Sequence, residues 1–189
     1  MAGLSARQGE MLVRLARQTL NSLLGVSRDE EPDQQALSDA AFQQKQGVFV
    51  TLKKNGELRG CIGSLVGTEP LVDAIRHQTE NAALQDHRFS PVRAEELARI
   101  KVEISILSPP KPLTFSDPSD LLAKLRPHVD GVILGLGNLQ ATFLPQVWEQ
   151  LPRPEEFLAH LAMKAGLSSQ AWRTEGVTIA TYQVQHFSE

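Results

Sequence analysis

The spacing of apolar residues along the chain changes between the period of a helix and that of a strand. Between residues 5 and 25, apolar side chains recur every three to four positions, which is typical of a helix with one buried face. Ser5 and Gln8 have the spacing of a capping box, and Gly25 is well placed to end the helix in a left-handed conformation. The polar and acidic segment 27–41 is interpreted as a connecting loop with room for a short helical turn.

The clearest strand pattern surrounds Asn55-Gly56. Val48, Val50 and Leu52 alternate with other residues before this dipeptide, and Leu58–Gly63 follows it. Asn and Gly both tolerate the positive φ angles of a type I′ turn, so a two-residue hairpin is predicted.

A two-residue turn pairs Lys54 with Glu57, and this pairing sets the register of the whole hairpin. Counting outward without interruption places Arg59 opposite Leu52, Gly60 opposite Thr51, Cys61 opposite Val50 and Ile62 opposite Phe49. Paired residues share a face, so Arg59 and Cys61 are expected side by side on the face of Val50 and Leu52. This expectation depends on an unbroken register, because a slip of one residue reverses the faces.

The rest of the chain alternates between the two periods without a repeating βα unit. We predict a helix from Thr68 as N-cap to about Gln85, a strand at 102–106 ended by Pro109-Pro110, a short helix from Asp117-Pro118 to about Leu125, a hairpin at 131–144, a helix at 154–165 stopped by Gly166 and a closing strand at 177–187. This order favours an α+β fold, a mainly antiparallel sheet flanked by helices. At 189 residues the chain fits one domain, with a possible smaller lobe inside it.

Composition and charge narrow the classes of function. The net charge of −3 gives no general attraction for nucleic acid, so no nucleic-acid partner is expected. No apolar run reaches the roughly 18–20 residues of a membrane span, and the first residues lack the pattern of a secretory signal. The single cysteine, Cys61, excludes an internal disulfide framework and zinc sites built from several cysteines. We therefore expect a soluble cytoplasmic protein, with no metal site and with no cofactor that the sequence identifies.

The segment Leu58–Gly63 carries the main candidate chemistry. Gly60 and Gly63 weaken a strand, and such glycines usually mark a bulge or the close approach of a backbone or a ligand. Arg59, two residues from Cys61 on the same face, would favour the thiolate and create a nucleophile or a soft ligand. The alternative is that Cys61 is a small buried residue of the core.

A second candidate group follows the predicted second helix. Asp86 would orient Arg59 or Arg88, or it would hold backbone amides in a turn in which Arg88 pairs with it and Phe89 anchors the loop. His87 fits a structural role better than proton transfer. Gln146, after the last strand of the second hairpin, is a further candidate for ligand contact.

These motifs resemble those of the AMMECR family, whose bacterial and archaeal members are also called AmmeMemoRadiSam system protein A. The resemblance covers nearly the whole chain in order, and its most specific motif is LRGCIG. It is carried by Gly47–Leu52, Leu58–Gly63, Asp86–Val92, Ile104–Pro109, Asp130–Val132, Phe143–Val147 and Lys164–Gly166. Where members often have His-Gly this chain has Asp130-Gly131, so no role is transferred to His128.

The resemblance implies an α+β domain with a larger and a smaller lobe, and it implies no established activity. The system name implies a Memo-like protein and a radical SAM enzyme as partners. Two hypotheses follow. The first is a non-catalytic binding or accessory module, in which Arg59 and Arg88 recognise a small acidic ligand or a partner's peptide. The alternative is a thiol-dependent enzyme that uses Cys61 as its nucleophile or redox thiol.

Overall fold

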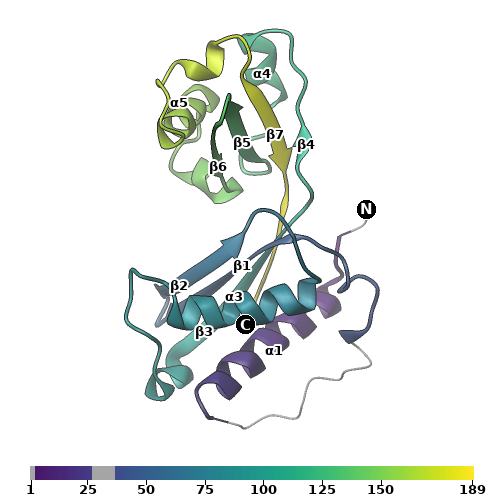
Figure 1. Cartoon of the computed structure of the whole chain (residues 1–189), viewed down its shortest axis with the longest axis vertical. Helices are drawn as coiled ribbons and strands as arrows, with labels where there is room; N and C mark the ends of the chain where they lie inside the picture. Colours follow the sequence, from purple (N-terminus) through teal and green to yellow (C-terminus); the bar gives the residue numbers. More distant parts are fainter. Residues whose placement is uncertain (1–2, 27–36) are drawn as a thin grey trace. The chain divides into compact units, whose positions relative to one another are not determined.

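The chain forms two compact units. The computed structural model describes residues 3–26 and 37–189, and Figure 1 shows the path of the chain. Unit 1 comprises Met1–Leu107 and Gln185–Glu189, and unit 2 comprises Ser108–Val184. The predicted loop 27–41 lies largely outside the described residues.

Unit 1 is built on an antiparallel sheet that is covered on one face by helices. Its described strands lie in the order β2 (Glu57–Ser64), β1 (Gly47–Lys54), β3 (Ile100–Leu107) and β8 (Val184–Ser188). Helices α1 (Ala6–Leu23) and α3 (Leu71–Leu84) lie against this sheet and against each other (Figure 1). Alternate residues of β1 and β3 face the helices and are buried, namely Val48, Val50, Leu52, Val102, Ile104 and Ile106.

The ends of both helices follow from local sequence. Ser5 and Gln8 form the predicted capping box at α1, and Gly25 takes a φ of 70° just beyond its end. Helix α3 begins two residues later than predicted, because Pro70 rather than Thr68 is its N-cap.

The hairpin of β1 and β2 has the predicted turn but not the predicted register. Asn55 and Gly56 have φ angles of 54° and 86°, and Lys54 pairs with Glu57. The register then shifts, so that Lys53 pairs with Leu58 but Leu52 pairs with Gly60. Arg59 is the extra residue of a β-bulge, and the predicted pairing of Leu52 with Arg59 is wrong.

The bulge moves Cys61 to the other face of the sheet. Cys61 pairs with Thr51 and Ile62 pairs with Val50, so the expectation that Cys61 shares the face of Val50 is wrong for the same reason. Gly60, paired with Leu52, now faces α3. A Cβ atom there would overlap the carbonyl oxygen of Ala82, and the glycine is therefore required by the close approach of α3.

Unit 2 has its own sheet and its own core. The described strands run in the order β4 (Lys111–Pro112), β7 (Thr178–Tyr182), β5 (Gly131–Leu136) and β6 (Leu139–Phe143). Trp148 stacks on Phe157 with ring centroids 3.7 Å apart at the centre of this core. The helical elements are α4 (Pro118–Lys124) and α5 (Pro154–Lys164), with 3₁₀ turns η2 (Pro145–Glu149) and η3 (Ala171–Arg173); unit 1 contains the 3₁₀ helix η1 (Ala94–Arg99).

The predicted closing strand 177–187 is two strands. Strand β7 pairs with β4 and β5 of unit 2, and β8 joins the sheet of unit 1. Both strands have the same two-residue period, and this pattern alone does not mark the break at Gln183. The α+β prediction with antiparallel sheets and flanking helices is confirmed. No helix among the described residues is long and apolar enough to cross a membrane.

Gly60→Ala tests the packing of α3 on β2. We expect a loss of about 1–3 kcal/mol in unfolding free energy, because the added methyl group forces α3 away from the strand. Chemical denaturation of the full chain measures this loss. Glu57→Ala, at an exposed position of the same strand, is the control and should change stability by less than about 0.5 kcal/mol. Equal stability of the two variants would contradict the packing described here.

Candidate functional site

Strand β2 is an edge strand, and the backbone of Cys61 is bound by two side chains instead of a neighbouring strand. The Cys61 amide donates to Asp86 Oδ2 at 2.8 Å. The Cys61 carbonyl accepts from Arg88 Nη2 at 3.2 Å. Asp86 and Arg88 thus form a clamp that satisfies both polar groups of this peptide edge.

The two side chains of the Asp86–Arg88 clamp also bind each other in bidentate geometry. Arg88 Nε lies 2.9 Å from Asp86 Oδ1, and Arg88 Nη2 lies 2.7 Å from Oδ2. The Asp86 side chain is only 4% exposed, whereas that of Arg88 is 57% exposed. Hydrogen bonds from Arg88, and then from the Cys61 and Arg88 amides, hold the pKa of Asp86 well below its usual range. Asp86 is therefore a buried carboxylate whose charge is compensated.

The connection after α3 places both residues. Asp86 Oδ1 accepts from the Arg88 amide, and the Asp86 carbonyl accepts from the Phe89 amide at 2.9 Å. These bonds close the turn that the sequence allowed for at Asp86. His87, at the tip of this turn, is exposed.

Arg59 belongs to a second ion pair. Its Nε and Nη2 atoms lie 3.0 and 2.9 Å from the two carboxylate oxygens of Glu96 in η1, and Nη2 also donates to the Pro91 carbonyl. Lys54 Nζ lies 2.7 Å from Glu96 Oε1. The hydrogen bonds from Arg59, followed by those from Lys54, lower the pKa of Glu96. At 12% exposure, Arg59 is largely enclosed by this pair.

The ring of Phe89 joins the two pairs. The guanidinium carbons of Arg59 and Arg88 lie 5.9 and 5.6 Å from its centroid, within the range of a cation–π contact. Arg59, Phe89 and Arg88 therefore form one cluster along the edge of β2.

The thiol of Cys61 lies apart from the helical core. Its Sγ atom is 3.2 Å from Thr51 Oγ1, and the residue is half-buried. The hydrogen bonds that Arg88 donates to Asp86 raise the pKa of Arg88. Arg88 donates to the Cys61 carbonyl, whereas Arg59, which was expected beside the thiol, is paired with Glu96.

The sheet face that carries Cys61 continues into a polar row. Thr51 pairs with Glu103 of β3, whose carboxylate lies 2.8 Å from Lys53 Nζ and 3.7 Å from His186 Nε2. Within residues 3–26 and 37–189, no three His, Cys, Asp or Glu side chains lie close enough to hold a metal ion. This row therefore offers thiol, hydroxyl, carboxylate and imidazole groups without forming a metal centre.

The structure brings some of the predicted site residues together and separates others. Cys61, Asp86 and Arg88 are in direct contact, and Arg59 joins them through Phe89. Gly60 is buried under α3. Gly63 lies against β1, where a Cβ would overlap the Val48 carbonyl oxygen. Gln146 belongs to unit 2, where it is exposed in η2.

Sequence reasoning missed Glu96 and Thr51. Glu96 lies 37 positions after Arg59 in the sequence, and a separation of this length does not indicate that the two residues form an ion pair. Thr51 was assigned the wrong partner, because nothing in the hairpin pattern marks the bulge.

The fold and the cluster define a class: two-unit α+β proteins in which an Arg-Gly-Cys edge strand is held by an Asp-His-Arg-Phe turn. The sequence model of the AMMECR1 family matches residues 13–187, and the chain belongs to this family.

Relatives with curated sequences match over the full length. A protein of Methanothermobacter thermautotrophicus is 39% identical, over 100% of this chain and 97% of its own length. A protein of Thermofilum pendens is 37% identical, over 100% and 93%. The crystal structure of the uncharacterized protein PH0010 from Pyrococcus horikoshii is similar, with a TM-score of 0.81 and 35% identity over 96% of this chain and 91% of that one.

The two compensated carboxylates predict an acid-sensitive fold. The folded pKa values of Asp86 and Glu96 lie below their ordinary values of 3.8 and 4.5, so the unfolded chain takes up protons first as the pH falls. Unfolding free energy is therefore expected to decrease below about pH 5 and to keep falling as the pH passes through the folded pKa values. Urea unfolding between pH 7 and pH 2 measures this slope.

Asp86→Asn should make that slope shallower, since the amide has no carboxylate to protonate and still accepts from the Cys61 amide. Glu57→Gln, at an exposed position with no ion pair among the described residues, should follow the wild type. An Asp86→Asn slope equal to that of the wild type would show that the clamp does not contribute to acid sensitivity.

Proposed function

We propose that the protein is a non-catalytic binding module that recognises a carboxylate or phosphate group through Arg88. The observation that carries the proposal is the state of the Arg88 side chain. Its Nε and Nη2 atoms hold Asp86, while Nη1 has no hydrogen-bond partner among the described residues. More than half of the side chain is exposed. Nη2 also donates to the Cys61 carbonyl, so the clamp fixes the plane of the guanidinium and leaves Nη1 available to donate to an oxygen of an anion.

Arg59 has a supporting part in this proposal. It is buried in its pair with Glu96, and its guanidinium has little surface for a ligand. Its contact with Phe89 steadies the ring on which Arg88 also lies. The sequence predicts recognition of an acidic ligand by both Arg59 and Arg88. We assign it to Arg88 alone, with His87 and Phe89 as its neighbours in the chain.

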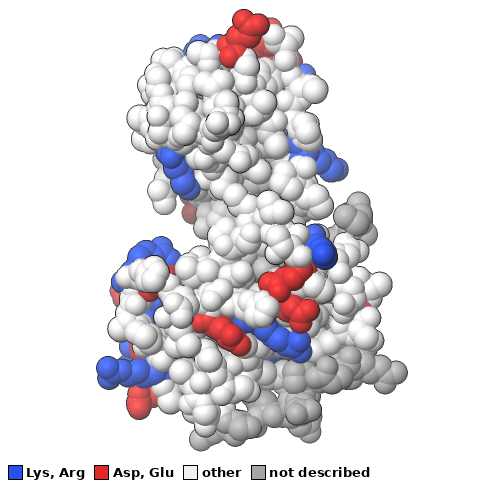
Figure 2. All heavy atoms as spheres, in the orientation of Figure 1, with Lys and Arg blue, Asp and Glu red and all other residues white. Residues whose placement is uncertain are grey.

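The proposed occupant is a small acidic ligand or an acidic peptide of a partner protein. The Memo-like protein and the radical SAM enzyme that the family name implies are the proposed partners, in the cytoplasm. On the face of unit 1 seen in Figure 2, basic and acidic side chains are interspersed, a pattern that suits local ion pairs better than a nucleic-acid backbone. Gln146 and Gly63 stay candidate contacts.

Binding measurements with Arg88 variants test the proposal. Titration calorimetry with the Memo-like protein and the radical SAM enzyme should give saturable binding to one of them, at least tenfold weaker for Arg88→Ala. Arg99→Ala changes an exposed arginine of the same unit outside the cluster and should bind as the wild type does. Thermal unfolding of each variant separates lost recognition from lost folding. Wild-type affinity in a folded Arg88→Ala variant would refute the assignment.

The second candidate is a thiol-dependent enzyme that uses Cys61. The half-buried Sγ atom beside Thr51 and the hydrogen bond from Arg88 to the Cys61 carbonyl favour this alternative. It would require the thiolate as nucleophile. The binding module is preferred, because no imidazole or carboxylate base among the described residues contacts Sγ.

The rate of Cys61 alkylation against pH separates the two candidates. For the binding module we expect the folded chain to be labelled more slowly than a free thiol, whose midpoint is about 8.5, and we expect unchanged partner affinity in Cys61→Ser. Intact mass spectrometry follows the labelling. Fast labelling with a midpoint well below that value, slowed in Arg88→Ala but not in Arg99→Ala, would instead establish an activated thiolate.

A further inference from the structure

Unit 2 contains a groove that is independent of the Arg88 cluster. It has a volume of about 610 Å³, within the range of small-molecule sites, and it is lined by two segments, residues 112–118 and 172–179. The Leu113 amide of one segment donates to the Ile179 carbonyl of the other at 2.8 Å. Its apolar lining comes from Leu113, Phe115, Trp172, Val177 and Ile179.

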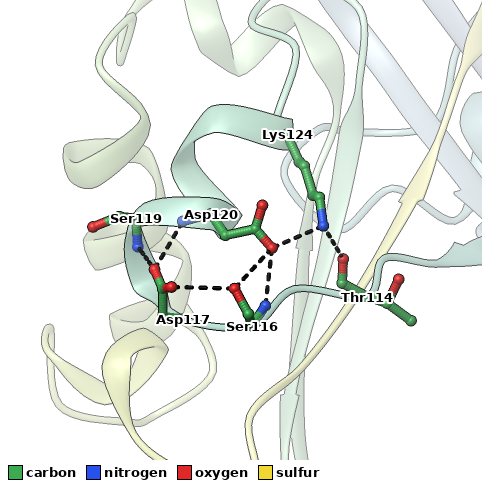
Figure 3. A network of polar contacts seen from close by, with 6 residues as sticks. All are labelled: Thr114, Ser116, Asp117, Ser119, Asp120 and Lys124. Atoms are coloured by element: carbon green, nitrogen blue, oxygen red, sulfur yellow. Dashed lines mark hydrogen bonds and ion pairs between the residues drawn. The ribbon is translucent and has the colours of Figure 1, made fainter.

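Side-chain hydrogen bonds fix the wall formed by residues 114–117. Asp120 accepts from the Ser116 amide at 2.9 Å and from Lys124 Nζ at 2.8 Å, and Lys124 also donates to the Thr114 carbonyl (Figure 3). Asp117 accepts from the amides of Ser119 and Asp120. These contacts hold the wall in place before any ligand arrives.

The opposite wall is a tight turn. The Thr174 amide and hydroxyl both donate to the Ala171 carbonyl, at 3.1 and 2.6 Å. Gly176 has a φ of 85°, which lets the chain turn back into β7. Both walls are therefore preorganised, which reduces the entropy lost on binding.

Arg173 on this wall differs from Arg59 and Arg88 of unit 1, which each contact a carboxylate. The guanidinium of Arg173 instead lies 4.1 Å from the ring centroid of Trp172, is exposed, and has no ion pair in the described part of the chain. Stacking fixes the plane of the group while its N–H edges remain available to an anion.

The other charges on the lining are acidic. Glu175 is exposed and has no ion pair among the described residues, and Asp117 lies across the groove in the segment 112–118. A ligand that carried only negative charge would be attracted by Arg173 and repelled by these carboxylates. A zwitterion with an apolar body matches the whole lining.

We propose that this groove binds an apolar amino acid or a short apolar peptide in its zwitterionic form. Its carboxylate pairs with Arg173, its ammonium group faces Glu175 and Asp117, and its side chain lies on the apolar lining of Phe115 and Val177. This site and the anion site at Arg88 are separate, so each can fail without the other.

The two tryptophans provide the test. Both are buried, but Trp172 belongs to the groove lining, whereas the Trp148 indole lies outside the lining and donates to the Asp130 carbonyl at 2.7 Å. Titration of the ¹⁵N-labelled full chain with L-phenylalanine should shift the Trp172 indole signal saturably and leave that of Trp148 unchanged. N-acetyl-L-phenylalanine, without the ammonium group, and L-phenylalaninamide, without the carboxylate, should each bind at least fivefold more weakly.

Arg173→Ala should weaken the binding of L-phenylalanine at least tenfold, while Arg153→Ala, an exposed arginine of the same unit, should not change it. An unshifted Trp148 signal shows that the variant core is intact. The proposal is overturned if L-phenylalanine gives no saturable shift, if both indole signals move together, if Arg173→Ala binds as tightly as the wild type, or if the two single-charge analogues bind as well as L-phenylalanine.

Discussion

The rest of the candidate site in unit 1 depends on the hydrogen bonds between the Asp86–Arg88 clamp and the backbone of Cys61. An edge strand exposes backbone donors and acceptors, and an isolated buried carboxylate is costly. Here Asp86 accepts a hydrogen bond from the Cys61 amide, which the edge strand would otherwise leave without a partner. Arg88 compensates the charge of the buried Asp86 carboxylate. Removing either partner would leave a buried polar group unsatisfied, which usually costs more than the bond itself contributes.

The two arginines of the cluster differ in exposure and in role. The bulge at Arg59 turns this side chain toward Glu96, where it is enclosed and serves packing. Arg88 remains exposed, because its own carboxylate partner is drawn into the strand edge beneath it. Phe89 lies within cation–π distance of both guanidinium groups and so connects the two ion pairs.

Much of this arrangement could be predicted from the sequence, for physical reasons that also explain the failures. The Asn55-Gly56 turn and the capping box at Ser5 depend on contacts a few residues apart, and both were found. The two glycines of β2 correctly indicated a bulge or a close backbone approach, and the structure has both. The position of the bulge depends on the packing of α3 against Gly60, and the spacing of residues in the hairpin gives no information about this packing. The pair of Arg59 with Glu96 and the change of sheet at Gln183 likewise arise from contacts between distant segments.

The division of the closing segment between two sheets has a consequence for synthesis on the ribosome. Unit 2 is one continuous stretch, whereas the sheet of unit 1 includes β8, which lies after unit 2 in the chain. The helices and the first three strands of unit 1 leave the ribosome early, but their sheet is complete only when β8 has been synthesised. Unit 2 can fold as soon as β7 emerges, so the unit that emerges first is completed last. During that interval the unpaired edge of β3 is open, and a chain interrupted after β7 would carry a complete second unit beside an unfinished first one.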